Sequence, residues 1–190
     1  MRIAVLALQG AFAEHCQKLS RLGAQTMELR KKEDLQHPFD ALILPGGEST
    51  VMGKLLRELD MFEILQKKIL HGLPTWGTCA GMILLAKKLE NDSSVHLGTM
   101  DITVKRNAYG RQLGSFHTLS SFGADTRVPM TFIRAPYISH AGETVEILSV
   151  VQGRIVAARQ DHQLVTAFHP ELDDDDRIHR YFLEMAAAHA

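Results

Sequence analysis

The first half of the chain alternates short, mostly apolar runs with longer segments of helical spacing. Runs that are apolar throughout are typical of strands covered on both faces. Strands are expected at residues 3–8, 26–29, 41–44 and 73–77, and helices at 11–22, 51–59, 61–71 and 82–89. Gly23 follows the first helix as its expected C-cap. This alternation predicts an α/β fold with a parallel, doubly wound sheet.

The second half changes to short β-like runs separated by Gly, Asn and Ser. They cover residues 96–105, 112–119, 130–134, 144–151, 154–159 and 164–168. Gln152-Gly153 has the composition of a hairpin turn. These strands are expected to extend the same sheet, partly in antiparallel orientation. A helix over 174–188 closes the chain, and the acidic run 173–176 is interpreted as a cap for it rather than as a metal site.

Composition narrows the class of protein. The 190 residues are 45% hydrophobic and 23% charged, with a net charge of −1, which is typical of one globular domain over residues 1–190. This balance gives no reason to expect a nucleic-acid partner. The N-terminal apolar run is too short for a signal peptide, and no run is long enough to span a bilayer. Two cysteines, Cys16 and Cys79, make no disulfide framework, so a cytoplasmic location is expected.

Gly77-Thr78-Cys79-Ala80-Gly81 lies between an expected strand and an expected helix. Gly-x-Cys-x-Gly in this place is the cysteine form of a nucleophile elbow. A thiol at a helix N-terminus is biased toward thiolate, and the amide of Ala80 could donate to an oxyanion. A buried structural cysteine remains open from this stretch alone, and Cys16, on the apolar face of its helix, is interpreted as core.

His169-Pro170-Glu171 follows the last expected strand. In an extended segment His169 and Glu171 point the same way, so the carboxylate could orient an imidazole that moves protons. With Cys79 they have the chemical types of a Cys-His-Glu triad. A surface turn is the alternative, and a zinc site is less favoured because the spacing is unfamiliar. No metal site is expected.

Pro45-Gly46-Gly47-Glu48-Ser49 follows the third expected strand. Paired glycines expose backbone N–H groups, which suits an oxyanion donor, although an ordinary tight turn would look the same. Gln9, Gly46-Gly47 and Cys79 each follow a strand. They should therefore gather at the carboxyl edge of the sheet, where such folds bind ligands.

The combination of these segments is more specific than any one of them. In this order they resemble class I, triad-type glutamine amidotransferases. The closer resemblance, over essentially the whole chain, is to the glutaminase subunits of pyridoxal 5'-phosphate synthase. It includes Leu8-Gln9-Gly10, Leu44 to Thr50, Lys105-Arg106-Asn107, Tyr109-Gly110-Arg111-Gln112, Phe132-Ile133-Arg134-Ala135-Pro136 and Phe168 to Glu171.

This resemblance implies a flavodoxin-like three-layer sandwich that hydrolyses L-glutamine to L-glutamate and ammonia through a glutamyl thioester. Cys79 would attack, His169 would move the proton, and Glu171 would orient His169. Backbone amides of Gly47 and Ala80 would form the oxyanion hole, with Gln9 acting on it indirectly. The positions that match the family's glutamine-binding residues are Gly47, Glu48, Ser49, Arg106, Ile133 and Arg134, of which Arg106 is favoured over Arg134 as a direct contact.

The resemblance also implies a partner, a (β/α)-barrel synthase subunit that consumes the ammonia, while the chain itself needs no cofactor. The partner is expected to dock on the edge that carries Cys79 and to organise the oxyanion hole. Three other functions remain open: the glutaminase of imidazole glycerol phosphate synthesis, a cysteine hydrolase or stress protein of the same sandwich, and a non-catalytic binding module. The histidines without motif context, His15, His117, His140 and His162, are interpreted as structural or solvated, with His162 facing water.

Overall fold

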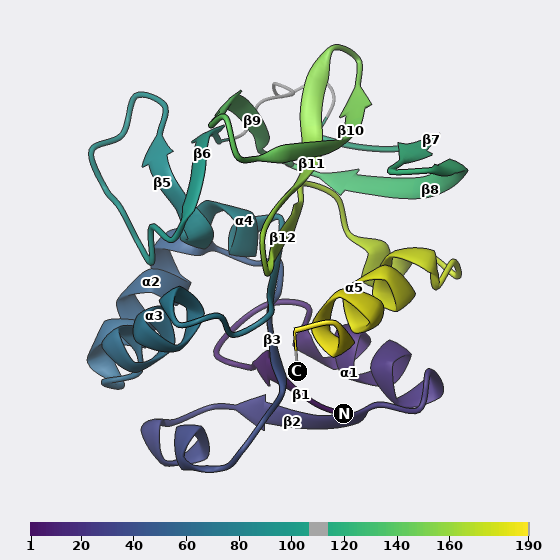
Figure 1. Ribbon diagram of the computed structural model, residues 1–190. Helices are drawn as coiled ribbons and strands as arrows, with labels where there is room; N and C mark the ends of the chain where they lie inside the picture. The colour runs from purple at the N-terminus through teal and green to yellow at the C-terminus, as the bar shows by residue number, and fades with distance from the viewer. Residues whose placement is uncertain (107–113, 190) are drawn as a thin grey trace.

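The computed structural model describes residues 1–106 and 114–189 (Figure 1). The strands are β1 Arg2–Leu6, β2 Gln25–Leu29, β3 Ala41–Leu44, β4 Thr75–Thr78, β5 Ala86–Leu89, β6 Met100–Lys105, β7 Ser115–Phe122, β8 Asp125–Ile133, β9 Tyr137–Ala141, β10 Glu146–Val151, β11 Arg154–Gln160 and β12 Gln163–Thr166. The helices are α1 Phe12–Arg21, α2 Ser49–Glu58, α3 Phe62–Leu70, α4 Ala80–Leu85 and α5 Arg177–Ala187, with 3₁₀ turns η1 Lys32–Gln36 and η2 Pro170–Leu172.

The main sheet has the order β2-β1-β3-β4-β12-β11-β9-β6-β5, and β10 pairs with β11. Its first five strands run parallel, as the β-α alternation predicts. Helices α1 and α5 cover one face of this parallel part and α2 and α3 the other, so the molecule has three layers (Figure 1). All four residues of β3 are buried, because helices cover it on both sides. The expected α/β fold with antiparallel strands in the second half is confirmed.

Three details of the predicted elements were wrong. Residues 86–89 are not the end of the helix after Cys79 but strand β5, which pairs in parallel with β6. Strands β7 and β8 form a two-stranded sheet of their own instead of extending the main one. Strand β9 was not predicted at all. All three errors have the same cause. Whether a segment forms a strand, and in which sheet, depends on the strand that pairs with it, and the local sequence does not reveal that partner.

The expected hairpin at Gln152-Gly153 is present, with φ of 51° and 73° at its two residues. Positive φ at both central positions is the geometry that joins two twisted antiparallel strands without splaying them. Gly23, with φ of 84°, ends the first helix in the left-handed conformation as expected. Within the described residues no helix is long and apolar enough to cross a membrane.

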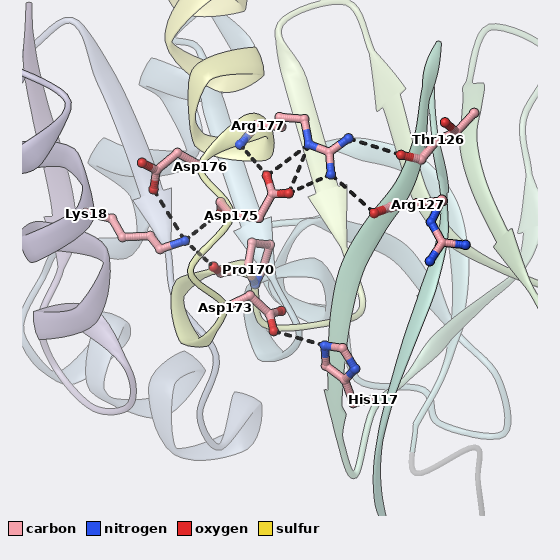
Figure 2. A network of polar contacts seen from close by, with 9 residues as sticks. All are labelled: Lys18, His117, Thr126, Arg127, Pro170, Asp173, Asp175, Asp176 and Arg177. Carbon is pink, nitrogen blue, oxygen red and sulfur yellow. Dashed lines mark hydrogen bonds and ion pairs between the residues drawn. The ribbon is translucent and has the colours of Figure 1, made fainter.

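Asp176, the N-cap residue of α5, makes no side-chain cap hydrogen bond, and the acidic run before this helix forms other contacts. Asp175 accepts hydrogen bonds from the backbone N–H and the guanidinium of Arg177, and Asp173 lies 3.3 Å from His117 (Figure 2). The buried amine of Lys18 in α1 donates to the carbonyl oxygens of Pro170 and Asp175 at 2.9 and 2.7 Å. The run therefore ties α1, β7 and α5 to the segment that carries Glu171.

Candidate active site

A cavity of about 430 Å³ opens at the carboxyl edge of the parallel strands. Gln9, Gly47 and Cys79, each of which follows a strand, all line it, as the topology predicts. The complete lining is Gln9, Gly47, Glu48, Ser49, Thr50, Cys79, Ala80, Ile83, Arg106, Ile133, Arg134, Pro136 and His169. The cavity thus brings together every predicted site residue except Glu171, which lies behind His169.

Cys79 lies on a sharp turn between β4 and α4. Its backbone angles φ and ψ are 49° and −101°, a conformation that residues other than glycine rarely adopt. The backbone N–H of Cys79 donates to the carbonyl of Thr166 in β12 at 2.8 Å, which holds the turn in place. A Cβ on Gly81 would stand 2.0 Å from the carbonyl oxygen of Leu44. The flanking glycine is therefore required by close packing against β3, while the strained angles fall on the cysteine itself.

His169 and Glu171 meet through a turn rather than along a strand. The sequence suggested an extended segment, but η2 begins directly after His169, whose ψ is 81°. The turn swings the carboxylate back, so that Oε1 of Glu171 lies 2.6 Å from Nδ1 of His169. Both residues are buried. The expected pair is therefore present, although its backbone geometry was predicted wrongly.

The electrostatics favour an imidazolium at His169. Burial alone would lower the pKa of this imidazole, but its hydrogen bonds with Cys79 and Glu171 and the charges of these two groups raise the pKa to about 10. Burial would likewise raise the pKa of Glu171, yet the neighbouring His15 and His169 lower it overall. A carboxylate beside an imidazolium can hold that ring charged next to a thiolate.

The loop after β3 packs against the loop after β1. The carbonyl of Gly46 accepts from the backbone N–H of Ala11 at 3.1 Å, and the side chain of Gln9 accepts from the backbone N–H of Glu48 at 2.7 Å. These two bonds fix the peptides on both sides of Gly47. A Cβ on Gly47 would stand 2.3 Å from Oε1 of Gln9. Gln9 therefore orients the backbone around Gly47, whose N–H is the predicted oxyanion donor.

Arg106 is held at the cavity wall by polar neighbours. Its Nη1 lies 3.3 Å from Oδ2 of Asp92 and 3.5 Å from the hydroxyl of Thr50. Its Nη2 lies 3.5 Å from Nε2 of His96. Nε of Arg106 is buried and has no hydrogen-bond partner among the described residues. Arg134, by contrast, is exposed and has a positive φ of 43°. Arg106 is thus held at the cavity wall by side chains from other segments of the chain.

A family model described as the SNO glutamine amidotransferase family matches residues 5–188. The chain belongs to this family. The resemblance stated from the sequence motifs is thereby confirmed.

Proteins from several organisms are similar to this one over nearly the whole chain. The "Pyridoxal 5'-phosphate synthase subunit PdxT" of Methanocorpusculum labreanum is 59% identical over 187 residues, with 98% of each chain covered. The protein of the same name from Desulfitobacterium hafniense is 58% identical, with 97% of this chain and 92% of that one covered. A solved structure described as "Crystal structure of glutamine amidotransferase" is 45% identical, covers 97% of this chain and 98% of its own, and superposes with a TM-score of 0.92.

A more distant solved structure shows the same fold. The "putative gmp synthase subunit a protein" from Thermoplasma acidophilum is 19% identical, with a TM-score of 0.69 over 99% of this chain and 94% of that one. The fold is therefore kept at low sequence identity.

Sequence reasoning did not assign every residue that lines the cavity. Thr50, Ile83 and Pro136 also line the cavity. Thr50 and Pro136 were quoted within matching motifs but not assigned to the site. His162 was expected to face water, yet it is half-buried and its Nε2 lies 2.7 Å from the carbonyl of Ile69. His15 is fully buried.

The motif residues Asn107 and Tyr109 to Gln112 lie outside the described residues. Among the residues that the structure describes, no group of three or more His, Cys, Asp or Glu is arranged to hold a metal ion.

Proposed function

We propose that the chain hydrolyses the side-chain amide of L-glutamine to L-glutamate and ammonia through Cys79, His169 and Glu171. The observation that carries this proposal is the contact of 2.6 Å between His169 and Glu171, behind a cysteine on a strained turn at a cavity wall. Membership of a glutamine amidotransferase family supports the choice of substrate.

The proposed reaction has two halves. Sγ of Cys79 attacks the amide carbon, and His169 gives a proton to the leaving nitrogen, so that ammonia departs and a γ-glutamyl thioester remains. His169 then takes a proton from water, which attacks the thioester and releases glutamate and the free thiol. Glu171 keeps the imidazole oriented and stabilises its charged form in both halves.

The oxyanion of each tetrahedral intermediate would be bound by the backbone N–H groups of Gly47 and Ala80. Both residues line the cavity beside Cys79. Gln9 acts indirectly, because its side chain accepts the N–H of Glu48 and so holds the backbone next to Gly47. Donors fixed in this way need little reorganisation when charge develops on the oxygen.

The rest of glutamine would be bound by side chains around the same cavity. Arg106 would bind the α-carboxylate, with Arg134 as a second cation at the rim, and Glu48 would face the α-ammonium group. Ser49 and Ile133 complete the wall. This assignment rests on the position of each group at the cavity and on its charge.

We further propose that the ammonia passes to a (β/α)-barrel synthase subunit that makes pyridoxal 5'-phosphate. The relatives carry the name of a subunit of that synthase, which supports a partner of this kind. The partner would dock on the edge that carries Cys79 and organise the loop around Gly47. Residues 1–190 would act as a single domain, and the two free thiols suit the reducing cytoplasm.

The test is ammonia release from glutamine by the purified chain, with and without the synthase subunit, and with Cys79→Ala as control. We expect release that rises when the partner is added and disappears in the variant. No release in either case would leave a non-catalytic binding module. Release that does not respond to this partner, but does respond to the barrel subunit of imidazole glycerol phosphate synthesis, would favour the rival glutaminase. Release that responds to neither partner would point to a free-standing amidase.

A further inference from the structure

Behind the pair His169 and Glu171 lie two more buried histidines that the proposed reaction does not use. His15 in α1 and His179 in α5 are each fully buried. Nδ1 of His15 lies 3.1 Å from Nε2 of His179, and Nε2 of His15 lies 3.4 Å from both Oε2 of Glu171 and the hydroxyl oxygen of Thr78. A continuous row of polar contacts therefore leads from His179 through His15 and Glu171 to His169.

The second carboxylate oxygen of Glu171 is short of donors. Oε1 is bonded to His169, but Oε2 is buried and accepts no hydrogen bond of good geometry from the described residues. A carboxylate keeps a low pKa when hydrogen bonds stabilise its ionised form. A buried carboxylate with one oxygen unpaired lacks part of that stabilisation. Nε2 of His15 is the ring nitrogen that faces this oxygen, at a distance that a small movement would close.

The hydrogen-bond pattern assigns the tautomers of both rings. Nδ1 of His179 is buried without a partner among the described residues. If that atom carried the proton, a buried N–H would be left unbonded, so the proton of His179 belongs on Nε2, which donates to Nδ1 of His15. His15 must then hold its own proton on Nε2, within 3.4 Å of both the carboxylate of Glu171 and the hydroxyl of Thr78. The opposite arrangement would turn the lone pair of His15 toward a carboxylate.

Both rings serve as neutral groups at physiological pH. Burial is the main reason that the pKa of each ring is lowered to about 3. The charged or titratable groups that face His15 do not reverse this lowering of its pKa; they are Glu171, His179, His169 and Lys18. A neutral donor strengthens the carboxylate without cancelling the negative charge that supports the imidazolium of His169.

The surroundings keep His15 in place. Its ring packs edge-on against the indole of Trp76, with 5.3 Å between the ring centroids. The ring of His179 packs edge-on against the same indole, with 4.8 Å between the centroids. One turn along α1, Lys18 binds the carbonyl of Pro170, next to Glu171 (Figure 2). Helix α1 therefore contacts the Glu171 turn at two points, one with a buried amine and one with a buried imidazole.

From this geometry we propose that His15 is a positioning residue for the proposed glutaminase reaction. Its Nε2–H holds Oε2 of Glu171, which keeps the carboxylate ionised and aimed at His169, and His179 fixes the tautomer that makes this possible. The proposal rests on the proposed function for its role in turnover, but the arrangement of the four groups can be tested without turnover.

The variants are a matched pair of amides. Gln at position 15 can place its amide nitrogen near the place of Nε2 and still donate to Glu171, whereas Asn reaches only the place of Nδ1. Leu19→Ala, a core truncation on the same helix, is the control for a loss of stability alone. The measurements are kcat and KM for glutamine in the complex with the synthase subunit, and NMR titration of the His169 ring.

We expect H15N to lower kcat by about 10- to 100-fold with KM little changed, because a hydrogen bond to a charged group is lost. The pKa of His169 should fall, because a less well oriented Glu171 supports the imidazolium less. H15Q should keep kcat within about threefold of the original chain. Leu19→Ala should lower the melting temperature and leave the pKa of His169 unchanged.

A wild-type kcat together with a wild-type pKa of His169 in H15N would overturn the proposal. If H15N does not fold, H15Q decides the matter. The proposal expects H15Q to keep its kcat, so a loss of kcat in the folded H15Q variant would overturn the proposal. If the unaltered complex releases no ammonia, the proposed function fails. The NMR titration of His169 then still shows whether His15 acts on that ring through Glu171.

Discussion

The imidazole of His169 occupies the space that a side chain on Gly46 would fill. An ideal Cβ on Gly46 would stand 2.3 Å from Cε1 and 3.0 Å from Nδ1 of His169, and 3.4 Å from the Cβ of Cys79. The loop after β3 therefore forms one wall of the contact between the two reacting groups. The glycine is needed there for space, since its φ is not in the left-handed region.

This contact predicts the result of Gly46→Ala. The added methyl group must push His169 away from Cys79, and a displacement of about 1 Å at a reacting group costs on the order of 100-fold in rate. We expect kcat for glutamine to fall by about that factor while the chain stays folded, as judged by circular dichroism. Gly114→Ala is the matched control, because a Cβ there meets no atom within 4 Å. Equal rates in the two variants would contradict the packing argument.

Glu171→Gln tests the charge behind His169. The amide keeps the size of the side chain but removes the negative charge that helps to raise the pKa of the imidazole to about 10. We expect the pKa of His169 to fall and kcat to drop by on the order of 100-fold or more, with KM little changed. Steady-state ammonia release and NMR titration of the ring measure the two effects. If the variant retains half of the original kcat, Glu171 has no essential role in the mechanism.

Arg106→Lys tests how the cavity recognises the substrate. Lysine keeps the charge but lacks the planar pair of donors that can hold a carboxylate bidentately. The substitution also removes the ion pair in which Nη1 of Arg106 lies 3.3 Å from Oδ2 of Asp92 and which orients the guanidinium. We expect KM for glutamine to rise about 10-fold with a smaller change in kcat. Arg134→Lys, at the exposed neighbour, is the control and should raise KM less; the reverse order would exchange their roles.

The buried pair His15 and His179 predicts a loss of stability in acid. The pKa of each is about 3 in the folded chain and 6.5 in a model peptide. Between these values the unfolded chain binds protons that the folded chain does not, so the free energy of unfolding falls as the pH drops below about 6.5. Urea unfolding between about pH 7 and pH 5 measures the slope. His179→Phe should reduce it, and the exposed His37→Gln should leave it unchanged; a flat profile in the unaltered chain would disprove the assignment.

The sequence alone determined those features of the protein that depend on local pattern. Buried strands such as β3 are marked by their apolar runs, because covered strands need apolar side chains on both faces. The order of strands and helices in the first half implies a parallel sheet, and a parallel sheet places the loops after its strands at one edge. Gln9, Gly47 and Cys79 could therefore be assigned to one site without coordinates, and the motifs around them pointed to the family.

Only the tertiary structure decided which distant groups meet and at what angle. Strand β5 continues the sheet because β6 offers it a partner, and residues 86–89 alone carry no sign of that. The turn at Pro170 sets the contact of His169 with Glu171, where sequence suggested an extended segment. His15 had no motif around it, since its partners come from β4, η2 and α5. Contacts between residues far apart in the chain depend on packing, which a local pattern does not encode.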